Sequence, residues 1–313
     1  MIVVKMMGNI GNQLFIYAFA RQLQCKYSGE RIIFDLSALK RYYYTAAYKL
    51  DSYELGDNIS YDLKELGLIH RFKFWFSSKF FHLERYIYHR LTKKSTVPEH
   101  MTKRWLRRGC IYYFDRLFLD IPETKRKYKY VYGYFQSDKY FKEIDGVIRN
   151  DLTLKNELTD SEKEVAKEMK NSNSIGISIR ANRTPENPKV KDNVWLGLAK
   201  SDYYYRAMKI MAEKVNNPKF FVFADSLDIV KKEFTFPYPV TFVTPNDSSS
   251  GVVLLSKCKN FIITNSTFSW WGSYLSAYKD KKVIMPNPWD RTGVYRDCIY
   301  YDNVIKLDCE FED

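Results

Sequence analysis

The sequence has little of what metal sites and disulfide scaffolds require. Five cysteines are scattered through 313 residues, with no Cys-x-x-Cys pair and no His–Cys spacing of the kind that binds zinc. An odd number of isolated cysteines fits free thiols in a reducing compartment. All four histidines lie between residues 70 and 100, so the second half of the chain offers no histidine as a catalytic base.

Long apolar runs and targeting segments are missing as well. The chain opens Met-Ile-Val-Val-Lys, without the basic start, apolar run and small-residue cleavage site of a signal peptide. No stretch approaches the roughly 18 uninterrupted apolar residues of a membrane span. We therefore expect a cytoplasmic protein without a membrane anchor.

Two common nucleotide-binding signatures are also absent. No Gly-x-Gly-x-x-Gly motif follows the first strand, which argues against a dinucleotide-dependent enzyme. No Asp-x-Asp pair stands where a metal-dependent transferase would hold its cation, and no catalytic-triad spacing is evident. We expect neither a metal nor a cofactor. Candidate general bases are Asp120, Asp138 and Asp145, and nothing in the sequence selects among them.

The overall composition indicates a folded protein of two domains. Hydrophobic residues make up 45% and charged residues 28%, the balance of a globular chain. A length of 313 residues exceeds one core of common size and suits two domains of about 150 residues each. Aromatic residues reach 17%, which either fills two cores or provides surfaces that stack on sugars.

A basic, aromatic segment stands out in the first half. Residues 62–130 hold 17 Lys and Arg against 7 Asp and Glu, most of the net charge of +13. Basic and aromatic residues interleave there, as in Arg71-Phe-Lys-Phe-Trp-Phe76. Three interpretations compete: a solvated face over core helices, an interface with an anionic membrane, and a nucleic-acid surface. Because no nucleic-acid motif accompanies the charge, we favour the first two.

Periodicity predicts alternating strands and helices. The opening reads as a strand at Ile2–Met7, a turn at Gly8–Asn12, a helix at Gln13–Lys26 and a strand at Arg31–Asp35, the first unit of a doubly wound sheet. The second half alternates in the same way. Its predicted strands are Ser174–Ile179, Phe220–Ala224, Val240–Val243, Asn260–Thr264 and Lys282–Met285, and its predicted helices are Ser161–Met169, Ser201–Val215, Leu227–Phe234, Ser249–Lys257 and Ser269–Ala277.

The pattern therefore predicts an α/β fold with two Rossmann-like domains, residues 1–152 and 153–313, facing a cleft. A basic aromatic helical insertion at about residues 50–127 interrupts the first domain. Ligands of open α/β sheets bind beyond the carboxyl ends of the strands, so the loops that follow strands are where a site is expected.

The first such loop is Gly8-x-x-Gly11-Asn12-Gln13. Its glycines let a ligand approach the backbone, and its two side-chain amides suit sugar hydroxyls. The helix that follows offers free N–H groups to an anion. An ordinary glycine turn accounts for the same residues, so this motif decides little by itself.

The second loop holds Arg180 and Arg183 at the end of a predicted strand. A guanidinium is the natural partner of a departing diphosphate, because its planar fork matches phosphate oxygens without a metal. A lone arginine is more often part of a structural salt bridge. Here the arginines stand at a strand end, opposite other polar loops, which makes a diphosphate-binding role more competitive with a structural salt bridge.

Two further loops follow strands of the second half. Asp225 could accept hydrogen bonds from a guanine base or cap the helix near Leu227, and the sequence leaves both open. The loop Asn265-Ser-Thr-Phe-Ser-Trp-Trp-Gly272 places an amide and several hydroxyls at a helix N-terminus, a favourable cradle for phosphate. Capping and core packing explain part of this motif, the paired tryptophans above all, but not its density of polar groups.

Together these stretches make the chain resemble glycosyltransferase family 11, the α-1,2-fucosyltransferases. The stretches that carry the resemblance are Gly8–Arg21, Gly133–Phe141, Phe221–Ser226 and Cys258–Gly272 with Val283–Pro286. The first and last are highly specific. The segment from about residue 50 to residue 127 carries little of the resemblance.

The resemblance implies a GT-B-like architecture and an inverting, metal-independent transfer of L-fucose from GDP-L-fucose to the 2-hydroxyl of a galactoside. The acceptor would belong to a glycan, lipid-linked glycans included, with the basic aromatic segment resting on the inner face of the membrane. Arg180 is the implied catalytic contact to the diphosphate. The implied donor-binding residues are Gly11, Asn12, Gln13, Arg183, Asp225, Asn265, Ser266 and Thr267.

One motif departs from the family. The usual His-x-Arg-Arg-x-Asp reads Ser-Ile-Arg-Ala-Asn-Arg at residues 178–183, so only the first arginine is matched. Arg183 is a candidate to supply the missing charge from a shifted position. The departure leaves two alternatives open: a transferase of the same fold that uses another GDP-deoxysugar, and an inactive glycan-binding homologue.

Overall fold

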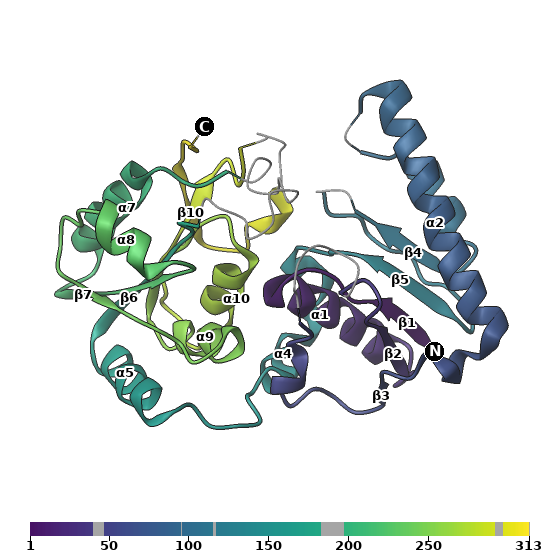
Figure 1. The fold of residues 1–313 in the computed structure, drawn as a ribbon, viewed down its shortest axis with the longest axis horizontal. Helices are drawn as coiled ribbons and strands as arrows, with labels where there is room; N and C mark the ends of the chain where they lie inside the picture. Colours follow the sequence, from purple (N-terminus) through teal and green to yellow (C-terminus); the bar gives the residue numbers. More distant parts are fainter. Residues whose placement is uncertain (40–46, 95, 115–116, 183–196, 292–296, 313) are drawn as a thin grey trace. The chain divides into compact units, whose positions relative to one another are not determined.

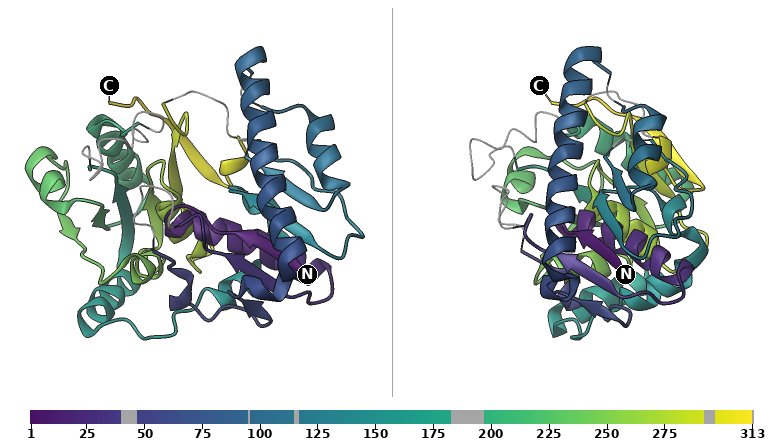
Figure 2. Two further views of the ribbon diagram at one scale, coloured as in Figure 1. Left: turned by 45° about the vertical axis from the view of Figure 1, so that its right-hand side comes forward. Right: turned by 90° about the vertical axis from the view of Figure 1, so that its right-hand side faces the viewer.

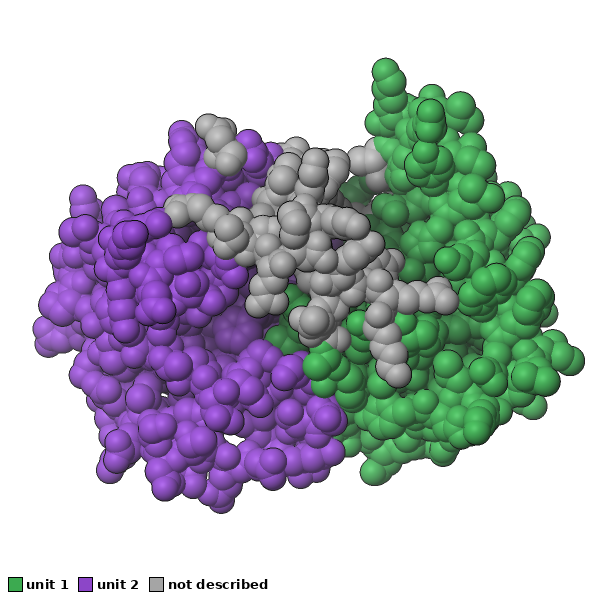
Figure 3. Space-filling view, viewed as in Figure 1, with its two compact units in different colours: residues 1–48, 55–152 green, residues 49–54, 153–313 purple. Residues whose placement is uncertain are grey.

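The computed structural model describes residues 1–39, 47–94, 96–114, 117–182, 197–291 and 297–312 (Figure 1). The chain divides into two compact units, Met1–Tyr48 with Leu55–Leu152 and Lys49–Glu54 with Thr153–Asp313 (Figure 3). Each unit is a parallel sheet with helices. This confirms the predicted α/β, GT-B-like class with two Rossmann-like halves.

The sheet of the first unit has five parallel strands in the order β3-β2-β1-β5-β4. Ile2, Val3 and Val4 of β1 and Ile32 and Ile33 of β2 are fully buried β-branched residues, as expected where helices cover a parallel sheet. The strand order reverses between β1 and β5, so the loops after these two strands lead away in opposite directions. The strands are β1 (Ile2–Lys5), β2 (Ile32–Asp35), β3 (Ile59–Ser60), β4 (Cys110–Tyr113) and β5 (Lys129–Gly133).

The first helix, α1 (Ile10–Lys26), begins three residues before the predicted start. Gly8 makes this possible, because its φ of 70° turns the chain sharply out of β1. A Cβ at Gly8 would lie 2.5 Å from the side-chain nitrogen of Asn12. The predicted turn at Gly8–Asn12 therefore includes the first turn of α1.

The segment at about residues 50–127, predicted as a helical insertion in the first domain, is partly an integral component of the first sheet. Two of the five strands, β3 and β4, come from this segment, so it completes the sheet. Short apolar runs such as Cys110–Tyr113 cannot be told from helix by periodicity alone. The helices here are α2 (Gly67–Thr92), which runs beside β4 and β5 (Figure 2), and α3 (Glu99–Leu106), and the unit ends in α4 (Asp145–Asp151).

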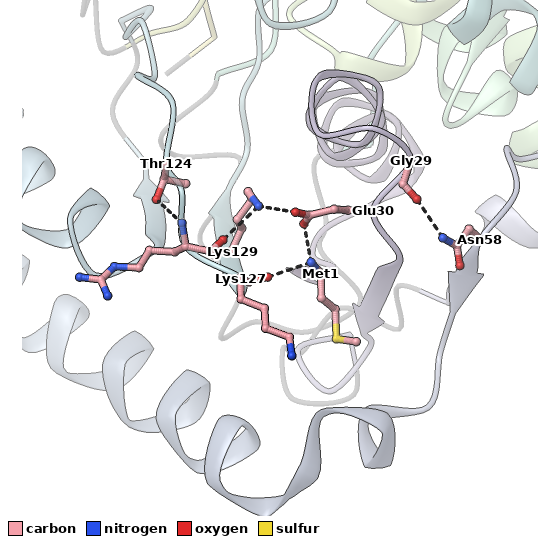
Figure 4. Close-up of polar contacts among 8 residues, drawn as sticks. Met1, Gly29, Glu30, Asn58, Thr124, Lys127 and Lys129 are labelled. Carbon is pink, nitrogen blue, oxygen red and sulfur yellow. Dashed lines mark hydrogen bonds and ion pairs between the residues drawn. The ribbon is translucent and has the colours of Figure 1, made fainter.

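A polar cluster closes the amino ends of β1 and β5 (Figure 4). Lys129 is 2% exposed, and its Nζ donates to Glu30 Oε1 at 2.7 Å and to the Arg126 carbonyl at 3.1 Å. The Met1 ammonium also pairs with Glu30 and donates to the Lys127 carbonyl at 2.9 Å. Burial alone would raise the pKa of Glu30, but these two cations outweigh it and lower the pKa.

The sheet of the second unit has six parallel strands in the order β11-β10-β9-β6-β7-β8. Its order reverses between β6 and β9. The strands are β6 (Asn173–Ile179), β7 (Pro218–Ala224), β8 (Val240–Phe242), β9 (Asn260–Ile262), β10 (Val283–Asn287) and β11 (Val304–Asp308). The helices are α5 (Asp160–Asn171), α7 (Ser201–Lys214), α8 (Leu227–Glu233), α9 (Ser248–Leu255) and α10 (Thr267–Leu275).

Two glycines bring α9 and α10 close to the second sheet. A Cβ at Gly176 of β6 would lie 2.7 Å from the Leu255 side chain, and one at Gly272 of α10 would lie 2.5 Å from it. Leu255 is fully buried between them. Any larger residue at either glycine would push α10, and with it the loop that precedes it, away from the strand ends.

Residues Lys49–Glu54 belong to the second unit, although they were predicted within the first domain. Tyr53 is fully buried, forms an antiparallel bridge with Leu154, and donates its hydroxyl to the Ser249 carbonyl at 3.1 Å. This contact is about 200 residues distant in sequence, which no local pattern reveals.

The glycines also provide a stability test within the first unit. A Cβ at Gly133 would lie 1.9 Å from the Tyr113 carbonyl oxygen of the neighbouring strand, a backbone atom that cannot move alone. We expect Gly133→Ala to lower the free energy of unfolding by about 3 kcal/mol. In Gly146→Ala on α4 the new Cβ meets no atom within 4 Å, and we expect a small gain of roughly 0.5 kcal/mol. Equal urea-unfolding midpoints for the two variants would contradict this account of β4 and β5.

Candidate functional site

The point where the strand order of the second sheet reverses gathers the predicted site residues of this unit. Continuing the register of β6 with β7 and β9, Arg180 is level with Asp225 on one side and with Asn265 on the other. Where the strand order reverses in this way, the loops after the two strands are expected to leave toward opposite faces of the sheet, as they do in open α/β sheets that bind a ligand there.

Arg180 follows the last residue of β6 and is half-buried. Burial lowers the pKa of its guanidinium from the ordinary value, and the neighbouring carboxylate of Asp225 acts in the opposite direction. The group stays cationic at neutral pH, since arginine starts so far above it. A partly desolvated cation at a strand end suits an anionic ligand, because its charge is weakly screened there.

Asp225 holds the loop that begins at Arg180. Its Oδ1 accepts hydrogen bonds from the backbone N–H of Ala181 at 2.7 Å and of Asn182 at 3.1 Å. It does not cap the next helix, since the N-cap of α8 is Ser226. Of the two roles left open by the sequence, capping is therefore wrong. The observed role, tying the end of β7 to the loop after β6, was not foreseen.

The start of α10 is open to an anion. The helix begins at Thr267, two residues before the predicted start, with Ser266 as its N-cap. The Ser266 side chain does not cap the helix, and no acidic residue stands in the first turn. Within the described part of the chain the hydroxyls of both residues make no hydrogen bond, and both residues are partly exposed. Two hydroxyls and the N–H groups of a first turn are together the arrangement expected of a phosphate cradle.

Asn265 and Ser269 support this cradle from behind. Asn265 is 3% exposed; its Nδ2 donates to the Gly197 carbonyl at 3.1 Å, and its Oδ1 accepts from Thr264 Oγ1 at 3.0 Å. The Ser269 hydroxyl is fully buried and donates to the carbonyls of Thr264, at 3.3 Å, and Ser266, at 3.0 Å. Both side chains fix the backbone between β9 and α10.

The paired tryptophans are packing residues, as predicted. Trp270 and Trp271 are fully buried, with ring centroids 5.2 Å apart in an edge-on arrangement. Trp270 also stacks on Tyr274 at 4.7 Å and donates its indole N–H to the Ile299 carbonyl at 2.7 Å. They anchor α10 to the core of the second unit.

The first unit has its own polar cluster where its strand order reverses. Asn12, in the first turn of α1, accepts a hydrogen bond at 2.7 Å from Gln136 Nε2, which follows β5. Gln13 is fully buried, and its Nε2 donates to the carbonyls of Gly8 at 2.9 Å and Ala47 at 3.0 Å. Gln13 thus fixes the turn, and Gly11 is buried beside it. Gln136 was not singled out from the sequence, although it lies in the stretch Gly133–Phe141.

The remaining predicted residues are Arg183 and the three candidate general bases. Arg183 lies outside the described residues. Asp145 is paired with Arg149 at 2.7 Å, Asp138 is buried, and Asp120 is exposed. Over the described residues, no three His, Cys, Asp or Glu side chains come together as they would to hold a metal ion. All five cysteines are free thiols, as predicted.

Two hollows lie at opposite ends of the second sheet. One of about 450 Å³ is at the carboxyl ends of β10 and β11, lined by charged residues that include Lys200, Arg206 and Glu310. A larger one of about 1150 Å³ is at the amino ends of β7 and β8 and is lined by none of the predicted site residues. The smaller hollow lies at the same edge of the sheet as Arg180 and the start of α10, but none of the predicted site residues lines it either.

Two serines at the start of α10, Ser266 and Ser269, allow a structural role to be distinguished from a ligand-binding role. We expect Ser269→Ala to lower the free energy of unfolding by about 1 kcal/mol, because its buried hydroxyl donates to two carbonyls. Ser266→Ala, whose hydroxyl has no such partner in the described structure, is expected to change stability by less than about 0.5 kcal/mol. Urea unfolding of both variants checks this, and the reverse order would show that Ser266 is the structural residue.

Comparison with known proteins covers nearly the whole chain. Residues 1–305 match the model of glycosyl transferase family 11. The chain is 27% identical over 294 residues to an alpha-1,2-colitosyltransferase of Escherichia coli, covering 92% of each chain. It is 28% identical over 306 residues to the O-antigen biosynthesis glycosyltransferase WbnK of the same organism, covering 90% of this chain and 92% of that one.

Among solved structures, the fucosyltransferase NodZ from Bradyrhizobium aligns over 87% of this chain and 90% of that chain, with a TM-score of 0.49 and 13% identity. The family match rests on sequence and includes both units, from the residue before β1 to the start of β11. On that ground the chain belongs to glycosyl transferase family 11.

Proposed function

We propose that this family 11 glycosyltransferase moves L-fucose from GDP-L-fucose to the 2-hydroxyl of a galactoside, with inversion and without a metal. The observation that carries the proposal is the combination, at one reversal point of one sheet, of the half-buried cation Arg180 with the open N-terminus of α10. Both are suited to a diphosphate, the charged part that distinguishes a nucleotide-sugar from other glycosides.

The reaction breaks the bond between the anomeric carbon and a phosphate oxygen. The acceptor oxygen forms the new bond from the opposite face and loses its proton to a base, while GDP departs with the electron pair. Negative charge grows on the diphosphate as the bond breaks, so donors aimed at it are worth more in the transition state than in the ground state. Arg180, the hydroxyls of Ser266 and Thr267, and the first N–H groups of α10 would supply these donors.

The remaining site residues have supporting roles in this proposal. Asp225 and Asn265 hold the backbone on either side of Arg180. Gly11, Asn12 and Gln13 shape the start of α1, where the Asn12–Gln136 pair would meet sugar hydroxyls. Arg183 would add a second positive charge to the diphosphate site, in place of the second arginine of the usual family motif.

A second donor has specific support. One relative is named for transfer of colitose with an alpha-1,2 linkage, and the other for O-antigen biosynthesis. Colitose is L-fucose without its 3-hydroxyl, and the altered stretch at residues 178–183 begins in the last two residues of β6 and contains Arg180. Transfer of colitose from a GDP-linked donor into an O-antigen is therefore the alternative reaction.

The decisive experiment compares donors directly. Purified protein is incubated with GDP-fucose or GDP-colitose and a panel of β-galactosides, and both GDP release and the product linkage are measured. We expect acceptor-dependent GDP release and an α-1,2 product with one of the two donors. A site that hydrogen-bonds the 3-hydroxyl would prefer fucose by a factor of about 10² or more, because those groups stay unpaired with colitose. Tight GDP binding without turnover on any acceptor would instead identify a glycan-binding protein.

Arg180 offers the sharpest test of the mechanism. We expect Arg180→Ala to reduce kcat by roughly 10²–10³-fold, because it removes a cation aimed at the leaving group. Arg180→Lys keeps the charge without the planar fork and should fall between. The matched control is Arg31→Ala at the amino end of β2, where Arg31 pairs with Glu65 at 2.9 Å, and it should leave kcat unchanged. Wild-type kcat in Arg180→Ala would remove Arg180 from the proposal.

A further inference from the structure

The helix α2 has two apolar faces, of which the structure uses one. The inner face is buried through Phe74, Ser77 and Phe81. The Phe74 ring stacks on Tyr130 of β5 at 5.4 Å, and the Ser77 hydroxyl is 2.7 Å from that of Tyr112 on β4. These contacts hold the helix against the sheet over residues 74–81, where its buried side chains lie.

The outer face of α2 is exposed and strongly apolar. In the described part of the chain, ten of the fourteen exposed large hydrophobic residues lie on this one helix. At 100° per residue they span an arc of about 160° opposite the inner face. Their exposed fractions run from 46% for Ile87 to 80% for Ile69. The ten are Leu68, Ile69, Phe72, Trp75, Phe76, Phe80, Leu83, Tyr86, Ile87 and Leu91.

The charges within the arc of this outer face are all positive. Lys79 and Arg90 stand within the apolar arc, Arg71 and Lys73 lie at its edges, and Lys93 and Lys94 follow the helix; all six are exposed. The one carboxylate of α2, Glu84, turns toward α3, where it pairs with Arg104 and accepts a hydrogen bond from the Trp105 indole at 2.9 Å. The outer face therefore joins apolar surface to an uncompensated positive charge.

We propose that the outer face of α2 is a docking surface for an anionic lipid bilayer. Large aromatic and aliphatic side chains interleaved with lysine and arginine are what an interfacial helix presents to acyl chains and headgroups. Trp75 and Tyr86 add the amphipathic rings that favour the interfacial layer. The helix, 26 residues and about 39 Å long, would lie in the plane of the surface while its inner face stays on the sheet.

Charge selects a lipid surface over other occupants. A second copy of this chain, meeting its partner face to face, would bring two sets of like charges together, which opposes association. A nucleic acid would satisfy the lysines and arginines but would leave Leu68, Leu83 and Leu91 without a partner. Anionic headgroups match the positive charge, and the layer beneath them takes up the apolar side chains.

Among the helices that the structure describes, none combines the length and the apolarity of a membrane-crossing segment. The docking proposal concerns α2 alone and does not depend on which sugar the protein transfers.

Vesicle sedimentation of the full-length protein tests the proposal. The probes are vesicles of phosphatidylcholine with about one-third phosphatidylglycerol, and vesicles of phosphatidylcholine alone. We expect the protein to sediment with the anionic vesicles, with a blue shift of tryptophan fluorescence from Trp75, and to bind the neutral ones at least about tenfold more weakly. Added salt should weaken the anionic binding.

Two variants distinguish the apolar contribution to vesicle binding from the electrostatic one. The triple change F72Q/W75Q/F76Q should weaken binding to anionic vesicles by more than about tenfold and abolish the blue shift. The triple change K73Q/K79Q/R90Q should weaken the same binding by about a hundredfold, roughly fivefold per charge. Its control, K167Q/K170Q/K209Q, removes the same charge from exposed positions of α5 and α7 and should bind like the wild type.

The variants also keep the proposal open to refutation. Each should retain the wild-type circular dichroism melt and GDP affinity, because every changed side chain is exposed. Equal vesicle binding by F72Q/W75Q/F76Q and the wild type would overturn the proposal. So would failure of the wild type to bind anionic vesicles, together with a concentration-dependent dimer in light scattering that F72Q/W75Q/F76Q abolishes, since the face would then be a contact between copies.

Discussion

β6 pairs with β7 on one side and with β9 on the other, each through a parallel ladder, and the site of the second unit depends on that double pairing. A slip of one residue in such a ladder would turn every side chain of the strand to the other face of the sheet. The register therefore keeps Arg180, Asp225 and Asn265 level. Because the strand order reverses beside β6, the loops that carry them part and leave room for a ligand.

Much of the polar density at the strand ends serves to hold the backbone in place. Asp225 ties the loop after β6, and Asn265 and Ser269 fix the backbone between β9 and α10. The groups that remain open are those at the helix start, Ser266 and Thr267. This division follows from the free-energy cost of burying a polar group without a hydrogen bond. A buried amide or hydroxyl therefore pairs with the protein and holds its backbone, whereas a partly exposed one is solvated and remains available to a ligand.

The long helix α2 shows the same logic on a larger scale. Its inner face pairs aromatic rings and a serine hydroxyl with the first sheet, while its outer face keeps ten large hydrophobic residues exposed. Exposed apolar area of this extent on one element is rare in a protein that meets only water. The basic side chains around it point to the charge of what covers it. This surface accounts for part of the unusual composition of residues 62–130, while other aromatic residues of the segment, such as Tyr112 and Tyr130, are buried in the first unit.

The sequence by itself determined the α/β class, the strand-ending loops and the family, because periodicity, glycine turns and a dense motif are local properties. It missed β11 and took β4 for helix, since a four- or five-residue strand carries little periodicity. It could not assign roles within the loops. Gln13 bonds to a carbonyl 34 residues away, Asp225 to an amide 44 away and Asn265 to a carbonyl 68 away. Only the tertiary structure decided which polar groups form hydrogen bonds within the protein, because their partners lie in distant parts of the sequence.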